Sequence, residues 1–209
     1  MLEGVKNIIF DFGGVIIPLD IQRTNQAFVT IALENKLALP NSKQSTIFND
    51  LETGKLTEAE FWSELRLLIG EVSDEKIEEA WLALLLELPE DRLRLILELK
   101  KKYRIILLSN TNEIHLRAIR EQNAKMPAEL HFSNLFDQEY YSHKISMRKP
   151  EKEIYQHVLD ESGLKAAETI FIDDVYENAI AAELVGVRGV HLDLDKHDLL
   201  SLFESAKVR

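Results

Sequence analysis

Short apolar stretches alternate with stretches of helical spacing from Pro89 onward, and this alternation restricts the fold more than any other feature of the sequence. The predicted strands are Asn7–Phe10, Arg104–Leu108, Phe136–Tyr141, Thr169–Ile172 and Arg188–Leu192. The predicted helices are Glu90–Lys101, one from about Asn112, Glu151–Ser162 and Tyr176–Val185. Strands that alternate with helices form a parallel sheet covered on both faces. We therefore predict an α/β fold with a doubly wound, Rossmann-like parallel sheet.

The segment between the first two strands follows a different pattern and predicts helices alone. Thr57 and Glu60 have the spacing of a capping box, and Asp20 is suited to cap an earlier helix. Two further sets of residues share helical spacing and are expected to pack inside: Phe61, Leu65 and Leu68, and Ile77, Trp81, Leu84 and Leu88. We predict an α/β core made of residues 1–17 and 89–209, with a helical cap at 18–88.

Polar side chains stand where the predicted strands end. Asp11 follows the first strand, Ser109 the second, and Asp173-Asp174 the fourth. In a parallel sheet the ligand site lies at the carboxyl ends of the strands, so these groups should meet. Lys149 precedes a helix opened by Pro150, where free backbone N–H groups favour anions.

Three clustered carboxylates repel one another unless a cation neutralises them. The chain has no cysteine, so an all-oxygen site for Mg²⁺ is the expected solution, with phosphate bound by Ser109, Asn110 and Lys149. Structural roles compete with these assignments. A turn would also select Asp11. A helix N-cap would select Ser109, Asn110 or Asn112, and the start of the next helix would select Asp173-Asp174.

Charge and composition narrow the classes of partner. The formal net charge of −11 argues against a broad nucleic-acid-binding surface, and the absence of cysteine excludes disulfides and thiolate chemistry. The longest apolar cluster, residues 80–86, is too short to span a membrane. The first residues show no signal-peptide pattern. We expect a cytoplasmic protein that binds a small phosphorylated metabolite, with no nucleic-acid or membrane partner; the sequence does not predict its oligomeric state.

Read in order, Asp11, Ser109, Lys149 and Asp173-Asp174 resemble the motifs of the haloacid dehalogenase-like hydrolase superfamily. The resemblance spans nearly the whole chain, including the helical insertion after the first motif. It implies that Asp11 is a nucleophile, that Ser109 and Lys149 bind the transferring group, and that Asp174 binds the metal directly. It also implies that Asp173 binds the metal directly or through water, and that residue 13 binds it through its backbone carbonyl.

Gly13 departs from the family pattern, which usually has a second aspartate two residues after the nucleophile. That acid protonates the leaving group and then activates water, and glycine can do neither. General acid–base help contributes roughly 10²- to 10⁴-fold in rate, so the loss matters most for poor leaving groups. A turn with positive φ would also select glycine at Gly13 and Gly14.

The favoured interpretation is a Mg²⁺-dependent phosphatase that acts on a small phosphorylated metabolite, such as a sugar phosphate, through an aspartyl phosphate on Asp11. A second hypothesis moves the attack of Asp11 to carbon, as in a haloacid dehalogenase. A third is a weakly active or inactive protein that binds phosphorylated ligands.

Overall fold

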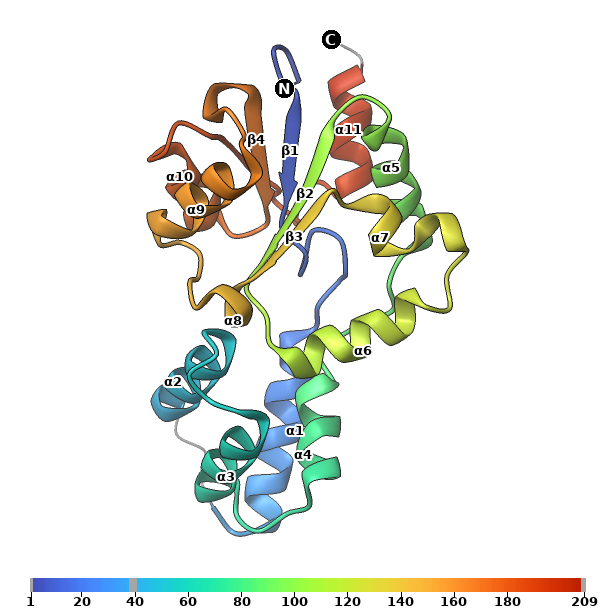
Figure 1. The fold of residues 1–209 in the computed structure, drawn as a ribbon. Helices are drawn as coiled ribbons and strands as arrows, with labels where there is room; N and C mark the ends of the chain where they lie inside the picture. Colours follow the sequence, from blue (N-terminus) through green and yellow to red (C-terminus); the bar gives the residue numbers. More distant parts are fainter. Residues whose placement is uncertain (1, 38–40, 208–209) are drawn as a thin grey trace.

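A sheet of five parallel strands forms the centre of the computed structural model, which describes residues 2–37 and 41–207 (Figure 1). The strands lie in the order β3-β2-β1-β4-β5. They are β1 (Asn7–Phe10), β2 (Arg104–Ser109), β3 (Gln138–Tyr141), β4 (Thr169–Asp173) and β5 (Arg188–His191). Ile9 of β1 pairs with Ile106 on one side and with Phe171 on the other, so β1 is central. The predicted doubly wound α/β core is confirmed.

Helices cover both faces of the sheet because alternate residues of each strand point to opposite sides. Ile8 and Phe10 pack toward one helix layer, and Ile9 packs toward the other. The first layer contains α5 (Glu90–Lys100), α6 (Glu113–Asn123), α7 (Phe132–Leu135) and α11 (Leu199–Lys207). The second contains α9 (Lys152–Ser162) and α10 (Tyr176–Glu183), on the opposite side of the sheet in Figure 1. Three short elements complete the core: η1 (Ala128–Leu130), α8 (Ser142–Ile145) and η2 (Ala166–Glu168).

Four helices between β1 and α5 form a separate layer, which we call the cap. They are α1 (Ile21–Glu34), α2 (Asn41–Glu52), α3 (Glu58–Ile69) and α4 (Asp74–Leu82). The predicted N-caps are confirmed: Asp20 accepts a hydrogen bond from the backbone of Arg23, and Thr57 and Glu60 form a capping box. Trp81 is buried in the centre of the cap, as predicted, and Trp62 is buried in the same apolar cluster. That the cap closes over a substrate stays a prediction.

The two chain segments that join the cap to the core run side by side. Asp20 N donates to Leu84 O at 2.8 Å, and Leu86 N donates to Pro18 O at 3.2 Å. Residues 84–86 are therefore paired with the other linker and do not continue α4, which ends at Leu82. The prediction that Leu84 and Leu88 share a helix with Trp81 is wrong, and Leu88 is buried in the core.

Charged pairs and an apolar residue are among the contacts that hold the cap against the core. Arg117 of α6 reaches Glu58 at 3.2 Å and Glu78 at 2.7 Å. Ile114, also on α6, belongs to the apolar cluster of the cap. A second contact, between Arg148 and α2, lies beside the candidate site described below.

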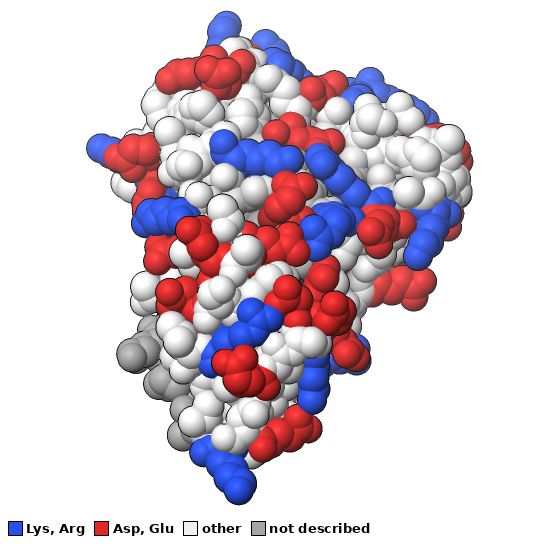
Figure 2. Space-filling model, turned by 60° about the horizontal axis from the view of Figure 1, so that its bottom comes forward, with Lys and Arg blue, Asp and Glu red and all other residues white. Residues whose placement is uncertain are grey.

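The surface view that brings the cap end forward shows acidic and basic side chains intermingled, with no broad basic area on that face (Figure 2). Within residues 2–37 and 41–207, no helix is both long and apolar enough to cross a membrane.

Candidate active site

Three strand ends meet at the edge of the sheet that faces the cap. Asp11 directly follows β1, and its backbone N–H donates to Ile172 O of β4 at 2.9 Å. Ser109 ends β2 and Asp173 ends β4, the two strands that flank β1. All three side chains are buried. The structure thus brings together the residues that the sequence placed at strand ends.

Lys149 enters this cluster from the loop between α8 and α9. Its side chain is 2% exposed, and Nζ contacts the Asp11 carboxylate, donates to Asp173 Oδ2 at 2.8 Å and donates to Leu108 O at 3.1 Å. The helix that follows, α9, begins at Lys152 and not directly at Pro150. The ammonium group therefore works as a buried point charge between two carboxylates.

Asn110 fixes the backbone of Lys149. Its Oδ1 accepts from Lys149 N at 2.9 Å, and its Nδ2 donates to Lys149 O at 3.0 Å. The side-chain amide is thus engaged in positioning the lysine, and its proposed contact with phosphate stays a prediction. The N-cap of α6 is Asn112, so Ser109 does not have the capping role that competed with phosphate binding.

The two late aspartates differ in environment. Asp173 is fully buried and accepts hydrogen bonds from Val175 N at 2.8 Å and from Asn178 Nδ2 at 3.1 Å, besides the one from Lys149. Asp174 is only partly buried. The N-cap of α10 is Val175 and has no side-chain cap bond, so capping does not account for this pair.

The electrostatics of the cluster oppose three free negative charges. Burial raises the pKa of Asp11 to about 7; Lys149 lowers it by less, and Asp173 and Asp174 add to the rise. Burial and Asp173 also raise the pKa of Asp174. Burial lowers the pKa of Lys149, but Asp11 and Asp173 together raise it above its ordinary value, so the lysine stays charged. A further cation would relieve the remaining repulsion.

Ligand oxygens of Asp11, Asp173 and Asp174 all lie within 4.8 Å of one another. Carboxylate oxygens are the donors that Mg²⁺ prefers, so this donor set fits the cofactor expected from the sequence. Asp174 is the most accessible of the three, whereas the bonds of Asp173 suit it to hold the ion through water.

Glycine is required by the backbone at position 14 but not at position 13. Gly14 has φ +80°, and a Cβ there would collide with the carboxylate of Asp174, so glycine is required. Gly13 is not in the left-handed region, and a Cβ there would meet the flexible side chain of Leu19, whose Cδ1 would be nearest at 2.7 Å. Backbone conformation therefore explains Gly14 but not the missing acid at Gly13.

A cavity of about 250 Å³ lies between the cap and this strand-end cluster. Ser109 and Gly13 open into it from the core side. Most of its lining is aromatic or aliphatic, and the residues concerned include Phe12, Ile17, Leu19, Phe48, Trp81 and Leu84. Its position beside Ser109 and its mostly apolar lining suit the organic part of a ligand.

His115 joins the cap to the core on the wall of this cavity. Its ring stacks on Trp81 with centroids 4.6 Å apart, Nε2 donates to Trp81 O at 3.0 Å, and Nδ1 accepts from Asn112 at 3.1 Å. Burial lowers the pKa of His115 from 6.5 to about 4, although its bond to Trp81 opposes the shift. The imidazole is therefore neutral at neutral pH.

This shift predicts a pH-dependent stability. Below pH 6.5 the unfolded chain protonates His115 and the folded chain does not, so stability is lost as the pH falls from 6.5 toward 4. Between pH 7.5 and 4.5, wild type should lose about 2 to 3 kcal/mol more unfolding free energy than His115→Gln. Urea unfolding at both pH values measures the difference; equal losses in the two proteins would contradict it.

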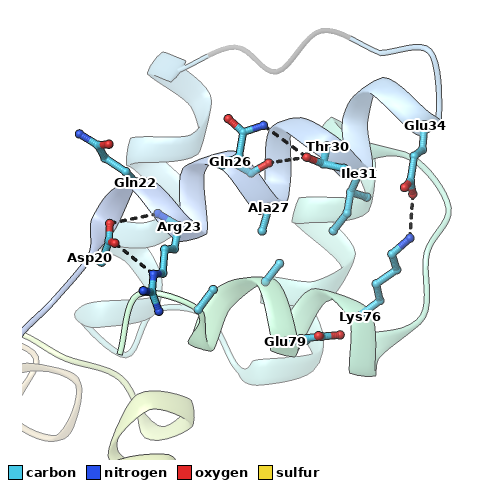
Figure 3. A pocket seen from close by; sticks show the side chains of 12 residues that line it. Asp20, Gln22, Arg23, Gln26, Ala27, Thr30, Ile31, Glu34, Lys76 and Glu79 are labelled. Carbon is cyan, nitrogen blue, oxygen red and sulfur yellow. Dashed lines mark hydrogen bonds and ion pairs between the residues drawn. The ribbon is translucent and has the colours of Figure 1, made fainter. Parts of the chain in front are cut away.

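A larger groove of about 730 Å³ lies between α1 and α4, away from the carboxylates (Figure 3). Most of its polar side chains are paired with one another: Asp20 with Arg23, Gln26 with Thr30, and Glu34 with Lys76. None of the strand-end residues lines this groove, whereas Ser109 and Gly13 line the smaller cavity, so the smaller cavity is the candidate site.

Three side chains at the site were not predicted from the sequence. Glu52, at the end of α2, lines the cavity. Arg148, next to Lys149, contacts Glu52 and Asn49 of the cap. Asn178 donates to Asp173, and its position in the first turn after Asp173-Asp174 is the sequence feature that could have indicated this role.

A carboxylate cluster at the strand ends of a parallel sheet is typical of α/β enzymes that handle anionic or metal-bound ligands. More specifically, the chain belongs to the haloacid dehalogenase-like hydrolase family, whose family model matches residues 5–186. The family predicted from the motifs is confirmed.

Several known proteins are similar along the chain. A D-ribitol-5-phosphate phosphatase of Bacteroides thetaiotaomicron is 36% identical over 177 residues, which cover 83% of this chain and 85% of that protein. A sesquiterpene phosphatase of Aspergillus oryzae is 51% identical over 65 residues, covering 31% of this chain and 33% of that protein. A family enzyme of B. thetaiotaomicron, solved with magnesium and inorganic phosphate, has a TM-score of 0.85 at 35% identity and covers 95% of this chain and 99% of its own.

Proposed function

We propose that the protein is a Mg²⁺-dependent phosphatase that acts on a small phosphorylated metabolite through an aspartyl phosphate on Asp11. The observation that carries the proposal is the buried cluster in which Lys149 lies between Asp11 and Asp173, beside Ser109 and the cavity. Two phosphatases among the relatives, and the relative solved with magnesium and phosphate, support the same reaction class. The ribitol phosphate relative supports a sugar or sugar-alcohol phosphate as substrate.

Each side chain has a defined task in this reaction. The Asp11 carboxylate attacks phosphorus, the bond to the leaving oxygen breaks, and water later hydrolyses the acyl phosphate. Ser109 donates to a phosphoryl oxygen, and the Lys149 ammonium offsets the negative charge that the group brings. Asn110 keeps Lys149 in place.

Asp11, Asp174 and the backbone carbonyl of Gly13 would hold Mg²⁺, with Asp173 beside them. The ion supplies charge neutralisation at the phosphoryl oxygens when it is bound. A cytoplasmic location, and the absence of nucleic-acid and membrane partners, stay predictions.

Removing the metal should stop the reaction. With 4-nitrophenyl phosphate as substrate, excess EDTA should lower phosphate release by at least about 100-fold, because the phosphoryl charge and the carboxylates then repel. Added Mg²⁺ should restore the rate. Full activity in EDTA would contradict the proposal, and halide release from 2-haloacids under those conditions would indicate the dehalogenase alternative.

The alternative of a protein that binds phosphorylated ligands without hydrolysing them predicts a different result. It predicts that inorganic phosphate with Mg²⁺ raises the thermal midpoint by mass action while no phosphate ester is hydrolysed. Such a result across a broad panel of phosphate esters would replace the proposed function.

A further inference from the structure

The loop after β1 has no side chain at position 13 that can give a proton to the leaving group. An alkyl phosphate needs a proton on its leaving oxygen, and Gly13 has no side chain to give one. The space next to Gly13 is occupied by Leu19, whose Cδ1 would lie 2.7 Å from a Cβ at that position. This side of the cavity is therefore apolar, and a proton donor must stand elsewhere on its wall.

Two titratable side chains occur among the described residues that line the cavity, Glu52 and His115. His115 is unsuited to the task, because both ring nitrogens are engaged with Trp81 and Asn112 and the low pKa of the ring keeps it neutral. Glu52 is thus the one carboxyl group in this lining, and it comes from the cap.

Glu52 is held at the cavity by the loop that carries Lys149. Its Oε2 lies 3.5 Å from Arg148 Nη2, and Arg148 Nη1 donates to Asn49 Oδ1 at 2.7 Å, one turn earlier on α2. The Glu52 side chain is 23% exposed. Phe48, also on α2, lines the same cavity. The end of α2 therefore presents an acid to the space that Ser109 and Gly13 reach from the opposite side.

The protonation of Glu52 suits proton donation. Burial raises its pKa above the ordinary value, and the charges of Arg148 and Lys149 oppose the rise without cancelling it. Among neighbouring elements, α8 carries His143 and Lys144, and both contact Glu113 of α6. Arg148 and Lys149 are therefore the charges that act on Glu52.

We propose that Glu52, on the cap, is the general acid and base that replaces the aspartate missing at position 13. The inference rests on the proposed phosphatase function. As Asp11 attacks phosphorus, the electron pair of the breaking P–O bond passes to the leaving oxygen, which takes the proton of Glu52. The Glu52 carboxylate then accepts a proton from the water that attacks the aspartyl phosphate. Phosphate leaves, and both carboxyl groups return to their starting states.

The test compares leaving groups. Benzyl phosphate releases a poor leaving group and needs the proton, whereas 4-nitrophenyl phosphate releases a stable phenolate. Glu52→Gln should lower kcat/KM for benzyl phosphate by about 10²- to 10⁴-fold and for 4-nitrophenyl phosphate by less than about 10-fold. Glu52→Asp keeps an acid and should recover part of the selective loss.

Two further variants separate catalysis from packing. Asn49→Ala removes the neighbouring contact to Arg148 without touching an acid, so it should change both substrates by the same factor. Gly13→Asp in the Glu52→Gln background should restore benzyl phosphate turnover selectively, with Leu19 moving aside. Thermal midpoints of all variants show whether each one is folded.

The outcomes are distinct. Equal losses for the two substrates in Glu52→Gln, or no loss, would overturn the role of Glu52 and leave the phosphatase proposal intact. A wild-type protein that hydrolyses neither ester with Mg²⁺ would overturn the proposed function and this inference with it.

Discussion

Asp11→Asn should abolish phosphate release while leaving the protein folded. Asparagine has nearly the same shape but cannot form the acyl phosphate, so the rate on 4-nitrophenyl phosphate should fall by at least about 10⁴-fold. Rapid quenching and mass spectrometry should detect one added phosphoryl group on the wild type and none on the variant. Asp20→Asn is a matched control: Asp20 also follows a loop, it caps α1, and asparagine caps helices equally well.

Asp11→Asn should keep or raise the stability of the fold while it abolishes activity. The pKa of Asp11 is raised to about 7, so the folded environment opposes the ionised form, and stability is lost as the pH rises from 3.8 toward 7. Without Mg²⁺ at pH 7.5, Asp11→Asn should therefore unfold at the same urea concentration as wild type or a higher one. Lower stability of Asp11→Asn would contradict the unfavourable burial of the Asp11 charge, and unchanged activity would contradict its role as nucleophile.

The strand ends are the part of the site that the sequence predicts well. Asp11, Ser109 and Asp173 each follow a short apolar run, and in a parallel sheet the register of neighbouring strands then brings them to one edge. Local patterns also predict the capping box at Thr57 and the helix N-cap at Asp20, because both motifs act within one helical turn.

Contacts between distant segments account for what the sequence did not predict. Helical spacing continues past Leu82, yet the backbone of Leu84 and Leu86 bonds to the first linker, so α4 stops and Leu88 joins the core. The role of Asn110 depends in the same way on a loop 39 positions away. Glu52 meets Arg148 across the cap boundary, and no local periodicity encodes that approach.

Lys149→Met should weaken the fold as well as the reaction. Lys149 is 2% exposed and is the charge partner of Asp11 and Asp173, so its loss leaves two buried carboxylates without their counter-ion. Breaking such a buried pair from one side costs about 3 to 5 kcal/mol, and we expect this loss of unfolding free energy without Mg²⁺. The rate should fall by at least about 10²-fold, because the phosphoryl group loses its cation.

Magnesium should partly reverse the loss of stability, which separates this effect from simple loss of packing. The two uncompensated carboxylates attract the ion more strongly in Lys149→Met, so Mg²⁺ should raise the unfolding midpoint more in the variant than in wild type. Lys144→Met on α8 is the matched control, since Lys144 is 44% exposed and its ion pair is with surface Glu113. Urea titrations with and without Mg²⁺ measure all three proteins. A loss in Lys149→Met of less than about 1 kcal/mol, the size typical of an exposed pair, would show that Lys149 does not balance the buried charges.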